Sequence, residues 1–182
     1  ECGRENNGRD GMIEQERRVW IASVVERYEA SLIRYAFRIT GDLGRARDVV
    51  QETFLRLCRA GNEAPGDHLA EWLFTLCRNL AVDHLRKERR IRPMNDRMAQ
   101  EIAAPPSDAV GKQEEEDRMV KELEQLPKPQ QEVLRLKFQE GLSYREIGRI
   151  TGHSVTNVGF LIHTGLKRLR ERLAGSNLPA ST

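Results

Sequence analysis

A helix-turn-helix pattern in residues 141–173 constrains the fold of this chain more than any other feature. Ser143 is followed three residues later by Glu146, a pair that satisfies the free N–H groups at a helix start and predicts that a helix begins at Tyr144. Gly152 is the residue type that best supplies the left-handed backbone of a tight turn after such a helix. The segment therefore predicts a short helix, a turn and a second helix.

The second helix of this pair has an apolar face and a polar face. Ser154 is placed to cap its start. Apolar residues recur every three or four positions, which predicts one stripe along a helix of about five turns: Val155, Val158, Ile162, Leu166, Leu169 and Leu173. The opposite face carries Thr156, Asn157, Phe160, His163, Thr164 and Lys167. Such a helix is suited to enter a DNA major groove by its N-terminal half. A helical corner in a small bundle would show the same caps and turn, and is the alternative.

The rest of the sequence predicts an all-α protein. Aromatic residues make up 5% of the 182 residues and charged residues 32%, and apolar residues recur with the helical period through most of the chain. Asp42 and Asp67 are placed to open the second and third helices. We expect the helices before the helix-turn-helix at residues 17–39, 42–59, 67–92, 114–126 and from Lys128 to just before Gly141.

Proline and glycine divide the chain into two small helical domains. Pro93 ends the third predicted helix, and residues 93–113 contain further Pro and Gly with little apolar periodicity. We interpret this stretch as a flexible linker between a helical domain, 17–92, and a helix-turn-helix domain, 114–175. Fully extended, it could reach at most ~70 Å, close to two turns of B-DNA at roughly 34–36 Å each. The two ends are expected to be tails, the first of them disordered: residues 1–16 and 176–182.

Charge is distributed in blocks along the chain. Residues 1–77, 78–92, 93–126 and 127–182 carry net charges of −2, +4, −5 and +5, within a total of +2. The second block contains cations at the end of the third predicted helix, in greater density than the helix dipole needs. Two basic regions separated by an acidic one indicate two contacts with nucleic acid.

The sequence indicates neither a metal site nor a catalytic site. Cys2 lies in the polar tail, and Cys58 and Cys77 lie in apolar helical patterns without a Cys-x-x-Cys pair, so we interpret these two as buried small hydrophobes. Asp48 and Glu52 are one helical turn apart, but two carboxylates alone make a weak metal site. We expect no cofactor and no small-molecule substrate. No apolar run of about 20 residues and no secretory leader is present, so we expect a cytoplasmic protein without membrane insertion.

Three motifs, in this order along the chain, resemble the sigma-70 family of bacterial RNA polymerase sigma factors, of the extracytoplasmic-function (ECF) type. They are residues 39–42 with Asp48–Leu55, then Trp72–Leu73 with Arg78–Arg86, and finally Leu126–Pro127 with Gly141–Ile147. The resemblance covers the chain from about Trp20 to Leu173. It implies a protein that is not an enzyme, that has core RNA polymerase, promoter DNA and an anti-sigma factor as partners, and that helps to open the DNA strands.

The resemblance also implies roles for individual residues. Core polymerase would contact Asp48, Gln51, Glu52, Phe54 and Leu55. The promoter −10 element would contact Trp72, Arg78, Asn79, Asp83, Arg86, Lys87, Arg89 and Arg90. The −35 element would contact Ser143, Tyr144, Arg145, Ser154, Thr156, Asn157, Phe160, His163 and Lys167. The loop at residues 61–67, with Trp72 and Asn79, could receive an unstacked base, although spacing alone favours a core position for Trp72.

The predicted recognition helix departs from the family pattern. Where the family usually has a Lys-Ser-Arg run, this chain has Gly159, Phe160 and Leu161, and Gly165 follows one turn later. Each glycine costs a helix up to about 1 kcal/mol relative to alanine, and two cations that would touch DNA are absent. Phe160 could instead meet a thymine methyl group. We therefore expect −35 binding to be weak or differently specified.

Two other functional classes remain as alternatives. A helix-turn-helix regulator with an N-terminal sensing domain would bind duplex DNA without polymerase. A nucleic-acid enzyme such as a recombinase would need a Ser or Tyr nucleophile among arginines, or a carboxylate cluster for metal, and the sequence shows neither pattern. The leading interpretation is a promoter-specificity subunit of RNA polymerase.

Overall fold

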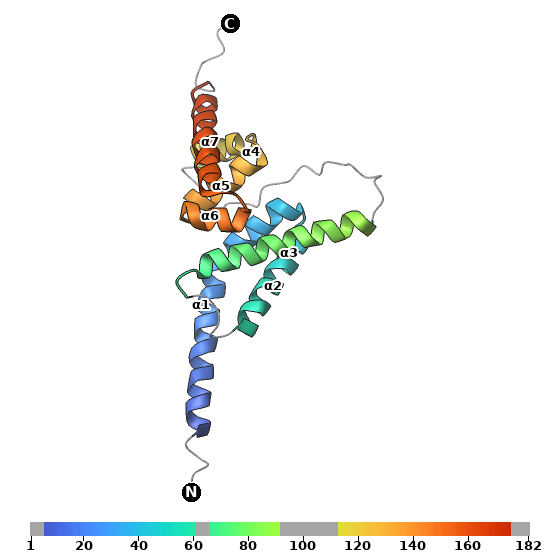
Figure 1. The fold of residues 1–182 in the computed structure, drawn as a ribbon, viewed down its shortest axis with the longest axis vertical. Coiled ribbons are helices and arrows are strands. Elements are labelled where there is room, and N and C mark those ends of the chain that lie inside the picture. The colour runs from blue at the N-terminus through green and yellow to red at the C-terminus, as the bar shows by residue number, and fades with distance from the viewer. Residues whose placement is uncertain (1–5, 61–65, 92–112, 176–182) are drawn as a thin grey trace. The chain divides into compact units, whose positions relative to one another are not determined.

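The described part of the chain folds into helices and forms two compact units, residues 1–103 and 104–182 (Figure 1). The computed structural model describes residues 6–60, 66–91 and 113–175. Within these ranges there are seven helices and no strand. The prediction of an all-α protein with two helical domains is confirmed, whereas most of the predicted linker and the C-terminal tail lie outside the described residues.

The N-terminal unit consists of α1 (Asn6–Thr40), α2 (Leu43–Ala60) and α3 (Leu69–Ile91), and each helix packs against the other two. The rings of Tyr35 and Phe74 meet edge to face, with their centroids 5.2 Å apart. The buried apolar side chains of this unit form a single core: Val24, Leu32, Tyr35, Ala36, Ala46, Val49, Val50, Leu57, Leu73, Phe74, Cys77 and Ala81.

The junction between α1 and α2 follows the predicted local chemistry. Gly41 has φ of +72°, a left-handed conformation that ends α1 immediately after Thr40. The Asp42 carboxylate then accepts a hydrogen bond from the Arg45 backbone N–H at 2.8 Å, which caps α2.

The N-terminal unit departs in detail from the predicted tail and from the apolar patterns of its helices. Helix α1 begins at Asn6, so it extends into the predicted disordered tail; a helix that has already formed adds residues at little cost. Val19 is 62% exposed. It lies five residues before buried Val24, and five residues correspond to a rotation of about 140° around the helix axis. Phe54 and Cys58 are only half-buried, while Thr53 is fully buried with its hydroxyl donating to the Val49 carbonyl at 2.8 Å.

The C-terminal unit consists of α4 (Gln113–Glu124), α5 (Lys128–Phe138), α6 (Tyr144–Thr151) and α7 (Val155–Gly175), with α7 in contact with each of the other three. Its buried apolar side chains are Leu126, Val133, Leu134, Leu136, Leu142, Ile147, Ile150, Val158 and Ile162. The predicted boundaries of these helices hold to within two residues.

Four residues that continue the apolar period of their helices are nonetheless exposed in this unit. Phe138 is 63% exposed, Met119 53%, Val120 36% and Val155 47%. Phe138 is the last residue of α5 and lies beyond its buried positions, which end at Leu136. Met119, Val120 and Val155 lie where no neighbouring helix of the unit covers them. The apolar period of α4 and α7 therefore extends beyond the part of each helix that is buried.

Buried polar residues replace part of the expected apolar core. Gln131 is 6% exposed, and its amide donates to the carbonyl oxygens of Glu124 at 2.8 Å and Leu126 at 2.7 Å. It thereby satisfies backbone groups at the end of α4. Arg135 is also 6% exposed, with its guanidinium 4.0 Å from the Glu124 carboxylate. Burial lowers the pKa of Arg135, and the nearby Glu124 charge opposes that shift.

Candidate nucleic-acid interface

One face of α2 carries the residues predicted to contact polymerase. Asp48, Gln51 and Leu55 are exposed, Leu55 by 45%. The Glu52 carboxylate is shared by the guanidinium groups of Arg56 at 2.9 Å and Arg59 at 3.9 Å. Asp48 rather than Glu52 therefore supplies the negative charge of this face. We call the set Asp48, Gln51, Glu52, Phe54 and Leu55 the α2 patch.

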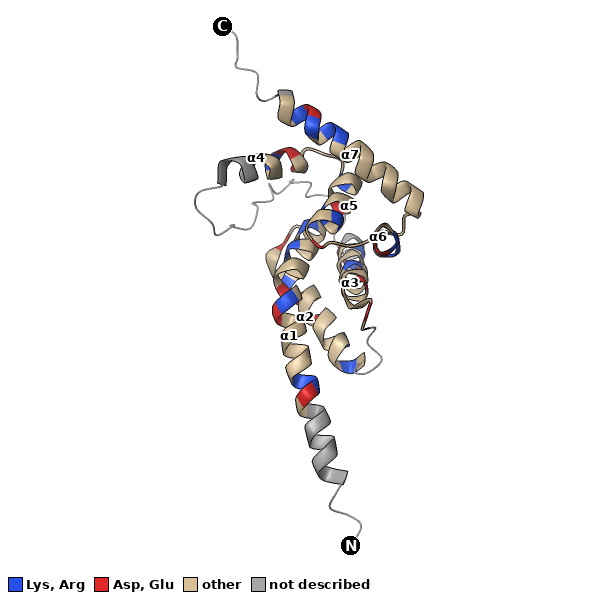
Figure 2. Cartoon of the chain, turned by 90° about the vertical axis from the view of Figure 1, so that its left-hand side faces the viewer, with Lys and Arg blue, Asp and Glu red and all other residues tan. Residues whose placement is uncertain are grey.

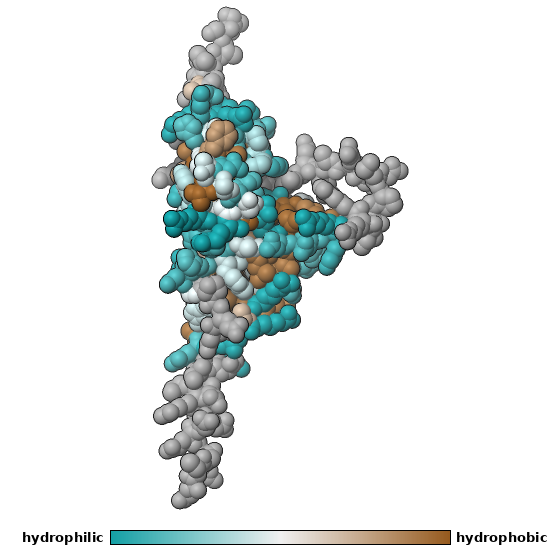
Figure 3. All heavy atoms as spheres, in the orientation of Figure 1, coloured by the Kyte–Doolittle hydropathy of each residue, from teal (hydrophilic) through white to brown (hydrophobic). Residues whose placement is uncertain are grey.

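A groove of about 430 Å³ borders the α2 patch, between α2 and α1. Phe54 and Leu55 contribute its α2 wall, and Val25 and Ile33 its α1 wall. Apolar groups also reach the surface of this unit in Figure 3, in the region of α2 and α3. The half-buried position of Phe54 is explained by this groove, because its ring forms part of an open surface rather than the core.

A single face of α3 carries four of the eight residues predicted to contact the −10 element. Trp72, Asn79, Asp83 and Arg86 follow one another at steps of seven, four and three, which places them on one side of the helix. Asn79, Asp83, Arg86 and Lys87 are exposed, whereas Arg78 is half-buried. Trp72 is half-buried and not in the fully buried core, so the core position favoured by its spacing was wrong.

The basic end of α3 is held to the start of α2 by an ion pair. The Arg45 guanidinium lies 2.6 Å from the Glu88 carboxylate, and both side chains are a little over one third exposed. Glu88 is the only acidic residue between Arg86 and Arg90 in the sequence. Because Glu88 pairs with Arg45, it does not neutralise Lys87, whereas the Arg86 guanidinium lies 3.8 Å from the Asp83 carboxylate. The side chains of Arg89 and Arg90 lie outside the described residues.

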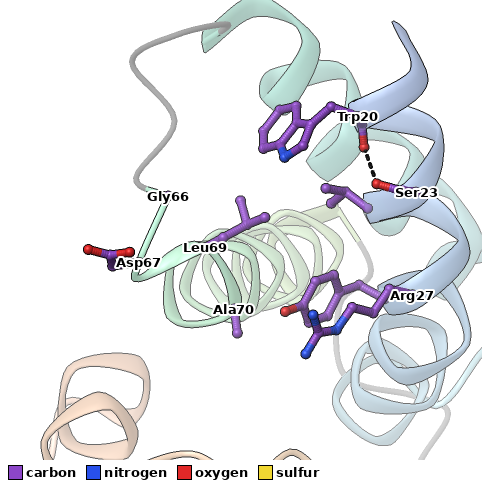
Figure 4. Close-up of a pocket in the computed structure, with 9 residues that line it drawn as sticks. Trp20, Ser23, Arg27, Gly66, Asp67, Leu69 and Ala70 are labelled. Carbon is purple, nitrogen blue, oxygen red and sulfur yellow. Dashed lines mark hydrogen bonds between the residues drawn. The ribbon is translucent and has the colours of Figure 1, made fainter. Parts of the chain in front are cut away.

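A second groove, of about 410 Å³, lies between α1 and the start of α3 (Figure 4). Trp20 and Arg27 point from α1 toward the start of α3, where Leu69 and Ala70 lie, and the Ser23 hydroxyl donates to the Trp20 carbonyl oxygen at 2.7 Å. The Arg27 guanidinium lies 5.2 Å from the ring centroid of Tyr28. Sequence reasoning missed this groove, because its lining residues are close only in the tertiary structure.

The predicted helix-turn-helix forms as expected from its caps. The Ser143 hydroxyl accepts from the Glu146 backbone N–H at 3.3 Å, and the Glu146 carboxylate accepts from the Ser143 backbone N–H at 2.7 Å. Gly152 has φ of +77°. The Ser154 hydroxyl accepts from the Asn157 backbone N–H at 3.2 Å and caps α7. These bonds set the relative direction of α6 and α7.

The predicted −35 residues all reach the surface of the C-terminal unit. The exposed set is Ser143, Tyr144, Arg145, Ser154, Thr156, Asn157, Phe160, His163 and Lys167. Thr164, which was predicted to face outward, is half-buried instead. Its hydroxyl accepts a hydrogen bond at 3.0 Å from the amide of Gln130 on α5.

Gln130 also reveals a surface residue that sequence reasoning missed. It is 5% exposed, and its amide oxygen accepts from the guanidinium of exposed Arg168 at 3.2 Å. A buried glutamine thus orients a cation on α7 beside the predicted DNA-binding residues. No pattern within α7 could predict this contact, because Gln130 lies 38 residues away.

The two described cysteines differ in their surroundings. Cys77 is fully buried, as predicted, and its thiol lies 3.9 Å from the Leu32 carbonyl oxygen. Burial raises the pKa of Cys77 to about 12, and a hydrogen bond with Thr53 partly opposes that shift. Cys58 is half-buried. Among the described residues, no helix is both long enough and apolar enough to span a bilayer.

Known proteins match this chain over both units. Residues 24–91 match the family model described as Sigma-70 region 2, and residues 116–169 match the one described as Sigma-70, region 4. ECF RNA polymerase sigma factor EcfG of Rhodopseudomonas palustris (strain TIE-1) is 33% identical over 141 residues, which are 76% of this chain and 77% of that protein. RNA polymerase sigma factor CarQ of Myxococcus xanthus is 33% identical over 156 residues, which are 80% of this chain and 88% of that protein.

A solved structure shows a similar arrangement of helices. It is the structure of CnrH in complex with the cytosolic domain of CnrY, with a TM-score of 0.57 and 21% sequence identity. The match covers 91% of this chain and 94% of that chain. At this level of identity the likeness shows the fold alone.

Proposed function

We propose, because this chain belongs to the sigma-70 family of RNA polymerase sigma factors and to its ECF group, that its two units divide promoter recognition between them. The chain is a sigma factor that directs RNA polymerase to promoters. A helix-turn-helix regulator that works without polymerase is not favoured, because the N-terminal unit matches the family's region 2. The chain acts by binding rather than by catalysis.

The N-terminal unit binds core polymerase through the α2 patch. An exposed carboxylate at Asp48 beside the apolar side chain of Leu55 suits a partner that combines positive charge with apolar side chains. The groove next to Phe54 would accept an apolar side chain of that partner. The patch leaves the core intact, because the opposite face of α2 already supplies it.

The same unit binds the −10 element through α3. The shared face of Trp72, Asn79, Asp83 and Arg86 runs toward the basic end of the helix, and this arrangement is the observation that carries the proposal. Cations hold phosphates and the polar face lies against bases. The groove at Gly66 offers Trp20 as a surface on which an unstacked base could lie.

The C-terminal unit reads the −35 element with α7, while α6 crosses the DNA backbone. Asn157 near the start of α7 approaches base edges, and Lys167 further along meets phosphates. We also propose that an anti-sigma factor is a partner, and that the protein works in the cytoplasm, where polymerase and chromosomal DNA are found. Family membership supports both proposals.

Run-off transcription with purified core RNA polymerase tests the proposed function. Adding the full chain should produce transcripts from promoters bearing its −10 and −35 elements, and core polymerase alone should not. Transcripts that do not depend on the added chain, or duplex binding by the chain that is unaffected by core polymerase, would contradict a sigma-factor function.

A further inference from the structure

The first part of the recognition helix α7 is uncharged. The sequence from Val155 to Leu166 contains no Lys, Arg, Asp or Glu, and the first cation is Lys167. Figure 2 shows this division, with the N-terminal part of α7 tan and Lys and Arg gathered toward its C-terminal end. Arg and Lys are the commonest readers of guanine in the major groove. The part of α7 that approaches base edges therefore lacks the usual reader of G·C pairs.

Phe160 projects from this uncharged surface. Its side chain is 62% exposed, and Thr156 and Asn157, which precede it by four and three residues, are also exposed. That spacing places the three side chains on one face of the helix. An aromatic ring left in water gains free energy when an apolar group covers it. The apolar group that the major groove offers is the C5-methyl of thymine.

Tyr144, the first residue of α6, brings a second aromatic ring near Gly159 of α7. The ring leaves room for a methyl group there, because a Cβ placed at Gly159 would lie 3.7 Å from Cε2 of Tyr144. Tyr144 is held there by Lys137, whose ammonium lies 5.5 Å from the ring centroid and donates to the Leu142 carbonyl at 3.2 Å. The ring is 39% exposed, so it adds a second exposed aromatic surface near Gly159.

We propose that α7 reads A·T base pairs in the upstream promoter element, with Phe160 packed against thymine C5-methyl groups and Asn157 bonded to adenine. The inference rests on the proposed function, because it requires α7 to enter the major groove. The Asn157 side chain carries an amide, which can bond N6 and N7 of adenine at once. Lys167 and Arg168, about two turns after Phe160, are left for phosphates, and Gln130 orients Arg168.

Selection from promoters with a randomised upstream element tests this reading. Holoenzyme assembled from the full chain and core RNA polymerase should select A·T pairs at the positions that face the first turns of α7. Each selected thymine is then replaced by uracil, which lacks only the C5-methyl group. Removal of a methyl group from an apolar interaction should weaken binding about fourfold at one or two of these positions.

Phe160→Ala identifies the side chain that makes the contact. Its holoenzyme should bind the thymine and uracil promoters equally, because the apolar partner has been removed. Phe138→Ala is the matched control: Phe138 is 63% exposed but lies on α5, outside the recognition helix, so the fourfold difference should persist.

Four outcomes overturn the inference. Selection of G·C pairs, or equal binding of thymine and uracil promoters by the unaltered holoenzyme, would contradict it while leaving sigma function intact. If Phe138→Ala removes the preference for thymine over uracil as Phe160→Ala does, the contact with the thymine methyl group cannot be assigned to Phe160. If no upstream sequence is selected although transcription proceeds, both this inference and −35 reading by the C-terminal unit fail.

Discussion

Two glycines in α7 look alike in the sequence but have different surroundings. Gly159 has open space except for the Tyr144 ring, which a methyl group would touch at an ordinary 3.7 Å. Gly165 is buried, and a methyl group there would lie 3.0 Å from Cδ1 of Leu134 and 3.4 Å from Cβ of Gln130. A methyl group at Gly165 would require Leu134 to shift by a few tenths of an ångström, whereas at Gly159 nothing needs to move.

Gly159→Ala and Gly165→Ala should therefore change stability in opposite directions. At Gly159 the gain in helix propensity is up to about 1 kcal/mol. At Gly165 the crowding of Leu134 should cost about 1–3 kcal/mol and outweigh the same gain. Hydrogen exchange of the α5 and α7 amides measures the free energy of unfolding of the C-terminal unit. Equal stabilisation by both substitutions would show that α5 and α7 move apart at little cost.

Burial of Cys77 should make the protein sensitive to high pH. The folded state holds the thiol proton up to pH about 12, whereas the unfolded chain releases it near the ordinary thiol pKa. The unfolded state therefore binds fewer protons between these values, so this contribution to stability is complete below the ordinary pKa and is lost as the pH rises toward 12.

Cys77→Ala should remove part of that alkaline loss of stability. The decrease in the free energy of unfolding between pH 8 and 10 should be smaller in the variant than in the parent protein, as measured by urea titration at each pH. In the folded parent protein at pH 8, iodoacetamide should modify half-buried Cys58 well before Cys77. Rapid alkylation of Cys77 in the folded protein would contradict its burial.

At the scale of elements, each helix with a proposed binding face keeps a separate face for the core. The buried side chains of α2 lie opposite Leu55, and those of α3 lie opposite Trp72, Asn79 and Arg86. A substitution on the exposed face can therefore test binding without disturbing the fold. This separation arises because one stripe of a helix is enough to bury it against its neighbours.

Leu55→Arg combined with Asp48→Lys should abolish capture of core polymerase by the tagged chain. The double substitution reverses the charge of the α2 patch and places a cation where an apolar contact is proposed. Asp48 is chosen because Glu52 is already paired with Arg56 and Arg59. Circular dichroism should show unchanged helix content in the variant.

Leu43→Arg provides the matched control for this experiment. Leu43 is 43% exposed and Leu55 45%, and both are on α2, but Leu43 lies at its first residue, outside the patch. The control should bind core polymerase like the parent chain. Equal binding by the double variant and the control would place the polymerase contact on another surface.

At the scale of the whole molecule, the two basic regions should contribute separately to DNA binding. They lie in different compact units, at the end of α3 and along the second half of α7. Each cation that neutralises a phosphate contributes about 0.7–0.9 to the magnitude of the slope of the logarithm of the binding constant against the logarithm of the salt concentration. Removing the cation lowers the slope by that amount. Regions that bind separate elements of one promoter should therefore add their effects.

Arg86→Ala with Lys87→Ala should lower the salt slope of holoenzyme binding to the promoter by up to about 2, and Lys167→Ala by about 1. The triple variant should lower it by the sum, about 3. Lys121→Ala, an exposed cation on α4, serves as the control and should leave the slope unchanged. A triple variant with no larger effect than its strongest component would contradict two separate contacts.

The surfaces of the candidate site were largely predictable, because a residue's exposure on a helix follows from the period of its neighbours. The exposed positions of Leu55, Asn79 and Asn157 are examples. The role of Arg168 was not predictable, since it depends on a buried glutamine from another helix. The groove at Trp20 was likewise invisible, because two distant segments form it.

The sequence by itself determined the helices, their caps and their turns, because these depend on interactions over three or four residues. The Ser143–Glu146 pair and the left-handed Gly152 show this. Only the tertiary structure decided which apolar residues are buried and which glycines are required. Phe138 belongs to an apolar pattern yet lies in solvent, and Gln130 is polar yet lies in the core. Burial depends on where a neighbouring helix begins, ends and approaches, and no local pattern carries that information.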